Sequence, residues 1–140
     1  MLRINKDVEY ALISLIAMTR SSEVQSAREL ANQFDIPYGL LCKILYRLAH
    51  AGIVVSVQGP KGGYRLAQGL EEVTIGRVME AIHGPARVAA CLEEAGDCSQ
   101  LDACNIRGIV QQVQSKWDLF VNSMTLAEFA AMETRAGVLE

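Results

Sequence analysis

The chain has 140 residues, a formal net charge of −3 and 51% hydrophobic residues. This length suits one compact domain, or a small domain with a helical arm, and the apolar content is sufficient for a packed core. The longest uncharged N-terminal run, Tyr10 to Thr19, has ten residues, whereas a membrane-spanning helix needs about 20, and no signal-peptide pattern follows it. We therefore expect a cytoplasmic protein with no membrane partner, whose four cysteines serve thiol, metal or redox chemistry rather than structural disulfides.

Charge is divided unevenly along the chain. Residues 1–70 contain eight Lys/Arg and five Asp/Glu, whereas residues 71–140 contain five Lys/Arg and eleven Asp/Glu. A basic first half beside an acidic second half is typical of a protein that contacts DNA at one end and has a separate task at the other. No Ser/His/Asp set, paired-carboxylate site or nucleotide fingerprint stands out, so we predict neither an enzyme nor a small-molecule substrate.

Three helices are predicted in the first third of the chain. Apolar residues at helical spacing predict a helix over 6–20. Ser26 and Glu29 have the spacing of a capping box that opens a short helix over 27–34. After a three-residue turn, a leucine stripe predicts a helix over 38–51. Two short helices joined by such a turn form a helix-turn-helix.

The outer face of the 38–51 helix is a candidate DNA-reading surface. Lys43 and Arg47 can meet phosphates or guanine edges, and Tyr46 can hydrogen-bond to or pack on the nucleic-acid backbone. An ordinary solvated face is the alternative, because charged outer faces are the rule for amphipathic helices. The full candidate set on this helix is Gly39, Lys43, Tyr46, Arg47 and His50.

A β-hairpin is predicted directly after this helix. Residues 53–57 form a mostly β-branched run, 59–63 read Gly-Pro-Lys-Gly-Gly, and 64–66 return as a strand. A hairpin after a helix-turn-helix is a winged helix. Lys61 at the tip, with Arg65 close by, is spaced to reach a DNA minor groove or phosphates, which favours the DNA-reading interpretation of the preceding helix.

Three cysteines follow the next predicted helix, which Thr74 caps and which ends at His83. Cys91, Cys98 and Cys104 lie in an acidic loop, with six residues between the first pair and five between the second. Soft thiolates in this arrangement favour an iron–sulfur cluster, either 2Fe–2S or 4Fe–4S.

Two other interpretations of the cysteine loop stay open. Zinc is one, with Glu9 or His83 completing a tetrahedron of three thiolates. A metal-free thiol switch is the other, in which two of the loop cysteines form a disulfide on oxidation. The fourth cysteine, Cys42, lies on the predicted DNA-reading helix, where a buried inert thiol is the default and a redox-sensitive thiol is the alternative.

The longest predicted helix covers 105–124 and carries a heptad seam. Its apolar residues are spaced 4, 3, 4, 3 and 4, and they are Ile106, Val110, Val113, Trp117, Phe120 and Met124. A seam that joins two copies in a homodimer and a helix docked on its own domain both fit this pattern. A short element begins at Thr125, and the tail beyond about Met132 is expected to be poorly fixed.

Several motifs together resemble the IscR/NsrR/RirA-type family of bacterial winged-helix regulators, from residue 1 to about residue 130. They are DVEYAL at 7–12, LAHAGIV at 48–54, VQGPKGGYRL at 57–66, VTI at 73–75 and TLAE at 125–128. The resemblance implies a mostly α fold with a small β-hairpin wing and a long C-terminal dimerisation helix. It also implies a homodimeric transcription factor that holds a cluster between one subunit's cysteine loop and the other subunit's first helix.

The resemblance also implies a ligand set for the cluster. In some members the partner's first helix supplies an acidic fourth ligand to the three cysteines, and the matching position here is Glu9, with Asp7 as the fallback. Other members use a histidine three residues after the last cysteine, where this chain has Arg107, which cannot serve. The first gap between cysteines is one residue longer than the family often has.

We therefore predict a dimeric regulator that binds double-stranded DNA under control of an iron–sulfur cluster sensing iron, redox state, oxygen or nitric oxide. The predicted domains are a winged helix-turn-helix (1–84), a cysteine loop (85–104), and a dimerisation helix with its tail (105–140). A zinc- or thiol-switch regulator is one alternative. The other is an iron–sulfur or metal-handling protein whose winged helix binds a protein.

Overall fold

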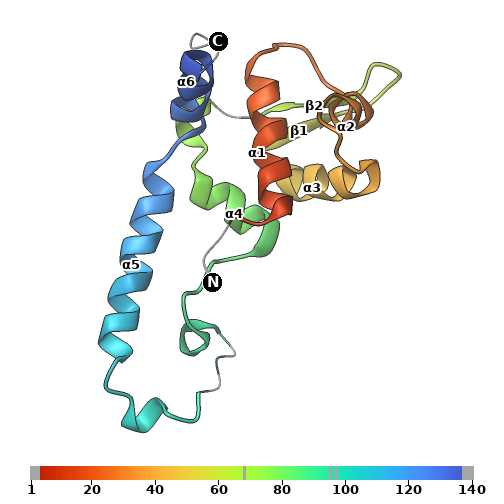
Figure 1. Ribbon diagram of the computed structural model, residues 1–140. Coiled ribbons are helices and arrows are strands. Elements are labelled where there is room, and N and C mark those ends of the chain that lie inside the picture. Colours follow the sequence, from red (N-terminus) through yellow and green to blue (C-terminus); the bar gives the residue numbers. More distant parts are fainter. Residues whose placement is uncertain (1–3, 68, 95, 97, 137–140) are drawn as a thin grey trace.

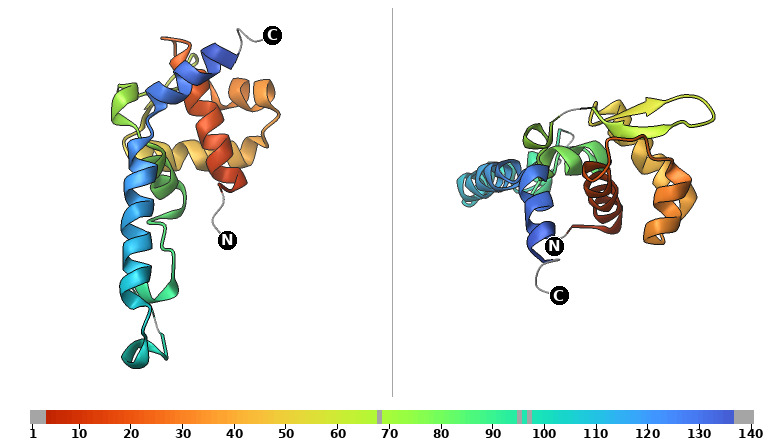
Figure 2. Two further views of the ribbon diagram at one scale, coloured as in Figure 1. Left: turned by 60° about the vertical axis from the view of Figure 1, so that its left-hand side comes forward. Right: turned by 90° about the horizontal axis from the view of Figure 1, so that it is seen from above.

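The computed structural model describes residues 4–67, 69–94, 96 and 98–136. These contain six α-helices and a hairpin: α1 (Lys6–Thr19), α2 (Ala27–Phe34), α3 (Tyr38–His50), β1 (Val54–Val57), β2 (Gly63–Leu66), α4 (Ile75–His83), α5 (Arg107–Ser123) and α6 (Leu126–Ala136). Three short 3-10 helices are interspersed: η1 (Leu70–Glu72), η2 (Ala90–Leu92) and η3 (Leu101–Ala103). Helix α5 and the cysteine loop extend from the other elements as an arm (Figures 1 and 2). No helix in the described ranges is long and apolar enough to cross a membrane.

The predicted helix-turn-helix is confirmed, and local features account for both ends of its first helix, α2. The Glu29 backbone N–H donates to Ser26 Oγ at 3.1 Å, and the Ser26 backbone N–H donates to the Glu29 carboxylate at 3.1 Å, as a capping box requires. At the other end of α2, Asp35 adopts a left-handed conformation with φ of 52°, which a short polar side chain tolerates. The chain then turns directly into α3.

The predicted wing is also confirmed. Strands β1 and β2 pair antiparallel, from Val54 opposite Leu66 to Val57 opposite Gly63. Gln25, just before α2, adds one further rung by exchanging two backbone hydrogen bonds with Tyr64, of 2.8 and 3.0 Å. A β-carbon on Gly63 would lie 2.3 Å from the Gln25 carbonyl oxygen, so this close approach of backbones requires glycine. The wing loop projects past α2, on the opposite side of the molecule from α5 (Figures 1 and 2).

One hydrophobic core joins the helices on either side of the wing. Helix α1 packs against α3, α4 and α6, and α3 packs against α2, α4 and β1. The largest fully buried apolar side chains come from all of these helices and from the strand-side loops: Leu15, Leu30, Leu41, Ile44, Leu45, Leu48, Ile53, Val73, Val78 and Leu126. Leu126 lies far along the chain on α6, so the C-terminal helix completes the core of the N-terminal domain.

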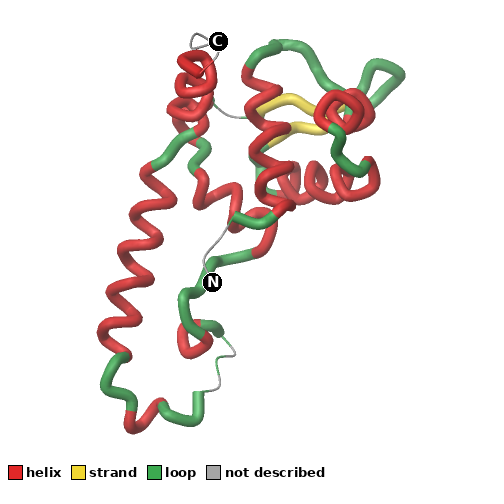
Figure 3. The backbone as a smooth tube through the Cα atoms, in the orientation of Figure 1, coloured by secondary structure: helices red, strands yellow, loops and turns green. Residues whose placement is uncertain are grey.

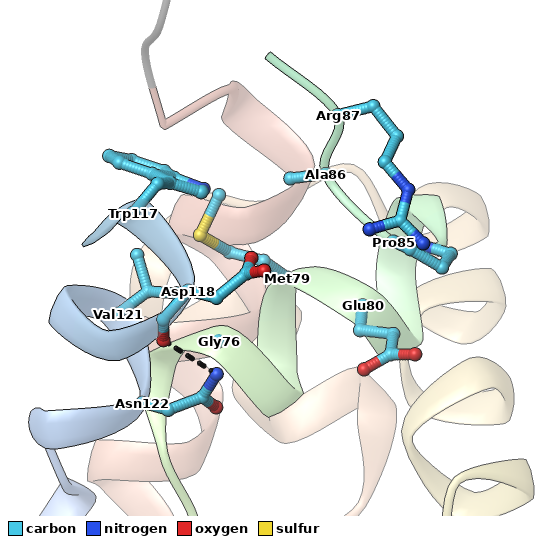
Figure 4. A pocket seen from close by; sticks show the side chains of 10 residues that line it. All are labelled: Gly76, Met79, Glu80, Pro85, Ala86, Arg87, Trp117, Asp118, Val121 and Asn122. Carbon is cyan, nitrogen blue, oxygen red and sulfur yellow. Dashed lines mark hydrogen bonds between the residues drawn. The ribbon is translucent and has the colours of Figure 1, made fainter. Parts of the chain in front are cut away.

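The start of α4 packs against the end of α5. The Thr74 hydroxyl caps α4 by accepting from the Arg77 backbone N–H at 3.1 Å, and it donates to Asn122 Oδ1 at 2.9 Å. A β-carbon on Gly76 would lie 2.5 Å from the same Asn122 oxygen, so glycine lets the two helices approach closely. Figure 4 shows Gly76 facing Asn122 and Val121 across this junction.

The C-terminal region differs from its expectation. The sequence predicts a short element after Thr125 and a poorly fixed tail beyond about Met132, whereas the backbone of α6 continues to Ala136, and the rest of the predicted tail, 137–140, lies outside the described residues. A second capping box explains its start, because the Thr125 backbone N–H donates to the Glu128 carboxylate at 3.0 Å and the Glu128 backbone N–H donates to Thr125 Oγ1 at 3.4 Å. The packing of Leu126 into the core then holds the helix in place.

Candidate DNA-reading face and cysteine loop

The five candidate residues on α3 lie exposed on one side of the helix. They are Gly39, Lys43, Tyr46, Arg47 and His50, and the side chains of Leu41, Ile44, Leu45 and Leu48 on the other side are buried. Tyr46 is 69% exposed, and its ring stacks on that of His50 with 6.4 Å between centroids. The predicted set therefore forms a continuous polar face that leaves the core unaffected.

The wing carries two exposed cations. Lys61 lies in the turn between β1 and β2, and Arg65 lies on β2, where its guanidinium reaches the Leu66 carbonyl at 3.5 Å. The wing follows α3 directly in the chain. The candidate residues of both elements therefore belong to one winged helix.

Arg28 and Tyr38 are two further candidate DNA contacts, which the sequence analysis missed. The Arg28 guanidinium at the start of α2 lies over the Tyr38 ring at the start of α3, 4.3 Å from its centroid, and both side chains are exposed. Periodicity within one helix cannot reveal this pair, because its members come from two helices. The predicted three-residue turn between the two helices is the sequence feature from which the contact could have been predicted.

Arg47 does not lie free on the reading face. Its Nη1 donates to the Ile82 carbonyl in the last turn of α4 at 2.7 Å. In the opposite direction, Nη2 of Arg77 on α4 donates to the Ala51 carbonyl at the end of α3, at 3.1 Å. The sequence analysis missed Arg77, and the two arginines link α3 to α4.

The three loop cysteines are half-buried free thiols that lie at different points along the loop. Cys91 is on η2, Cys104 follows η3, and Cys98 lies between them. Most of this path is irregular chain, as Figure 3 shows. Within the described part of the chain, no three His, Cys, Asp or Glu side chains are placed so that they could hold a metal ion. One copy of the chain therefore does not bring the predicted ligand set together.

Both ends of the cysteine loop are attached to α5. Gln114, a buried residue of α5, accepts from the Val88 backbone N–H and donates to the Ala86 carbonyl, each at 2.9 Å. The other end of the loop continues directly into α5 at Arg107. All three cysteines lie between these two attachments.

The candidate fourth ligands have other contacts in this structure. Glu9 accepts from Lys6 Nζ at 2.8 Å, and this hydrogen bond and negative charge raise the pKa of the exposed Lys6 ammonium. His83 Nε2 accepts from Asn5 Nδ2 at 2.6 Å, and Asn5 also caps α1. The start of α1 therefore touches the end of α4, where the cysteine loop begins, but neither Glu9 nor His83 joins the cysteines in the described chain.

The predicted seam on α5 divides into two halves. Ile106, Val113 and Phe120 are exposed, Phe120 to 58%, whereas Val110, Trp117 and Met124 are half-buried within their own chain. Ile109, which the heptad pattern missed, extends the exposed half and is 63% exposed. The helix thus docks on its own domain along one side and presents an apolar stripe on the other.

Comparison with known proteins finds relatives that match nearly the full length of the chain. An HTH-type, rrf2-like transcriptional regulator of Rhodobacter capsulatus is 30% identical over 97% of both chains. The repressor NsrR of Streptomyces coelicolor is 29% identical over 95% of this chain and 91% of its own. Among solved structures, CymR, the global cysteine regulator of B. subtilis, has a TM-score of 0.73 at 22% identity, covering 94% of this chain and 98% of its own.

A family model described as "Iron-dependent Transcriptional regulator", Rrf2, matches residues 4–132. This match confirms the predicted resemblance. The relatives above are transcriptional regulators, a class of protein distinct from enzymes. The chain belongs to the Rrf2 family of transcriptional regulators.

Proposed function

We propose that this Rrf2-family regulator is a homodimer that reads DNA with α3 and the wing, and that an iron–sulfur cluster in its cysteine loop controls DNA affinity. The observation that carries the proposal is the exposed polar face of α3 in a winged helix whose wing carries two further exposed cations. In winged-helix proteins the recognition helix enters the major groove while flanking elements contact the backbone. In this proposal the predicted domain 1–84 reads DNA, 85–104 senses, and α5 of 105–140 dimerises, while α6 completes the core of the first domain.

Two of the candidate DNA contacts are lysines, and their positive charge allows binding to be tested through its dependence on salt. Lys43 on α3 and Lys61 on the wing are exposed, and no hydrogen bond or ion pair within the described chain engages either side chain. A lysine that neutralises a phosphate releases a counterion, so its contribution is visible in the salt dependence of binding. A protein-interaction module would lack this dependence.

Lys43→Ala and Lys61→Ala are each expected to reduce the salt slope of binding to a mixed-sequence duplex by about 0.9, because one phosphate contact is lost. Fluorescence anisotropy at a series of salt concentrations measures the slope. Lys116→Ala, which removes an exposed cation from α5, is the matched control and should leave the slope unchanged. Weak, salt-independent binding of the unmodified protein would instead support the protein-interaction alternative.

The donor chemistry of the loop supports the cluster. Three free, half-buried thiols supply the soft ligands that iron–sulfur clusters prefer. They lie on a mostly irregular stretch between two attachments to α5, and we propose that the loop closes around a cluster while α5 stays in place. When bound, the cluster would supply a redox- and iron-dependent state, and Cys91, Cys98 and Cys104 would hold it.

Substitution of each loop cysteine by alanine is expected to abolish bound iron and acid-labile sulfide, together with the visible absorption, in protein purified without oxygen. Cys42→Ala is the matched control, because Cys42 lies on α3 away from the loop, and it should retain both. Metal analysis also separates the alternatives. Zinc in place of iron would indicate a zinc site, and a metal-free protein that forms a loop disulfide on oxidation would indicate a thiol switch.

We further propose that the partner subunit supplies Glu9 as the fourth ligand, as the family resemblance implies. Within one chain Glu9 pairs with Lys6 and does not join the cysteines. We expect Glu9→Ala to make the cluster labile, and dimers mixed from Glu9→Ala and Cys91→Ala chains to regain one intact site per dimer. Iron content and cluster lifetime of the purified mixed dimer measure this. No recovery in mixed dimers would show that the partner subunit's Glu9 is not a ligand.

The exposed stripe of α5 supports dimerisation through that helix. Apolar side chains of Ile106, Ile109, Val113 and Phe120 would leave water on association of two copies, which is the main driving force for such contacts. We expect Val113→Glu and Phe120→Glu to yield monomers in sedimentation equilibrium. Leu119→Glu is the matched control. Leu119 is 73% exposed but lies about 100° around the helix from Phe120, and its substitution should leave the dimer intact.

A further inference from the structure

Arg47 and Arg77 cap each other's helices. Arg47 of α3 donates to the Ile82 carbonyl at the end of α4, and Arg77 of α4 donates to the Ala51 carbonyl at the end of α3, at 2.7 and 3.1 Å. The last carbonyls of a helix have no partner within the helix, and its dipole favours a cation there. Both contacts are charge-assisted, so they stabilise the relative placement of the two helices.

Only one of these two arginines lies on the reading face. Arg47 is exposed among the other candidate DNA contacts, whereas Arg77 is half-buried between the helices. A guanidinium carries five donors in a fixed planar arrangement. The bond to Ile82 uses Nη1 of Arg47, and no other hydrogen bond within the described chain engages this exposed side chain.

We propose that Arg47 is shared between α4 and DNA, and that the last turn of α4 positions its guanidinium for a backbone phosphate. This inference rests on the proposed reading of DNA by α3. A long side chain that is already held in place loses less freedom on binding than one that moves freely. The Ile82 carbonyl therefore acts as a positioning group for the contact, although it never touches DNA.

The same arrangement couples the reading face to the cysteine loop. Gly84 ends α4 with φ of 78°, and its backbone N–H donates to the Glu80 carbonyl at 2.8 Å. This bond closes the turn that presents the Ile82 carbonyl to Arg47. The cysteine loop begins at the next residue. A change in the loop thus has only two residues to cross before it reaches the acceptor that holds Arg47.

Gly84 also allows the last turn of α4 to be disturbed without steric contact. A β-carbon there would have no atom within 4 Å, so Gly84→Ala acts through the backbone conformation (φ 78°, ψ −178°), which is essentially restricted to glycine. The experiment is a double-mutant cycle of Arg47→Ala and Gly84→Ala, with binding to a mixed-sequence duplex measured over a salt series. Lys43→Ala combined with Gly84→Ala is the matched cycle, since Lys43 is on the same face.

Arg47→Ala is expected to reduce the salt slope by about 0.9 and to weaken binding about tenfold. Gly84→Ala should weaken binding several-fold when Arg47 is present and have no further effect when Arg47 is absent, whereas its effect should add to that of Lys43→Ala. Arg47→Lys keeps the charge but lacks the planar group that can serve two acceptors at once. This variant should retain part of the slope and lose its sensitivity to Gly84→Ala.

Three results would overturn the inference or its basis. An unchanged slope in Arg47→Ala, with a reduced slope in Lys43→Ala, would leave Arg47 as a structural cap only. Additive effects of Arg47→Ala and Gly84→Ala would show that α4 does not position Arg47. If neither Lys43→Ala nor Arg47→Ala changed the slope, the proposed reading face itself would be wrong. Circular dichroism and urea unfolding of each variant establish that it is folded before binding is compared.

Discussion

The placement of α4 is the constraint on which the rest of the structure depends. This helix contacts α3 through the two arginine caps, α5 through the Thr74 and Gly76 junction, and α1 through the hydrophobic core. Its last residue also bonds to the first turn of α1 through Asn5. Helices α1, α3 and α5 are therefore each in direct contact with α4, and the cysteine loop follows it in the chain.

The buried face of α4 and its two ends are held by different kinds of contact. Its buried face, with Val78 and Ile82, packs into a dense apolar core that resists gradual deformation. Its two ends are held by a few polar bonds. A helix of this kind moves as a rigid unit when one end is displaced, so a change in the cysteine loop and a change at α3 are expected to occur together. A cluster that favours one placement of the loop would thereby favour one placement of α3.

Local signals explain why much of the fold was predictable from the sequence. The Ser26 capping box, the Thr74 cap and the glycine-rich wing turn each involve residues a few positions apart, so the sequence displays them directly. The exposed face of α3 also follows from periodicity alone, because the buried leucines define the opposite side.

Other features depend on distant parts of the chain and could not be predicted. The acceptor for Arg47 is a backbone carbonyl 35 positions away, and a carbonyl has no residue-type signature. The heptad seam was visible, but its division between Val110 and Trp117 on the inner side and Val113 and Phe120 on the outer side depends on where α4 docks. The cysteine spacing indicates soft ligands but does not determine where the loop places each thiol, because irregular chain has no periodicity.

The burial of Leu126 in the core has a consequence for synthesis of the protein. Helix α6 packs against α1 and η1, and its first residue has no exposed surface. Chains grow from the N-terminus, and domains fold as units once their parts have left the ribosome. The N-terminal domain of this chain cannot complete its core until α6 has emerged. A product that terminates before α6 keeps the exposed stripe of α5 but lacks the last residue of the core, so it is expected to remain incompletely folded.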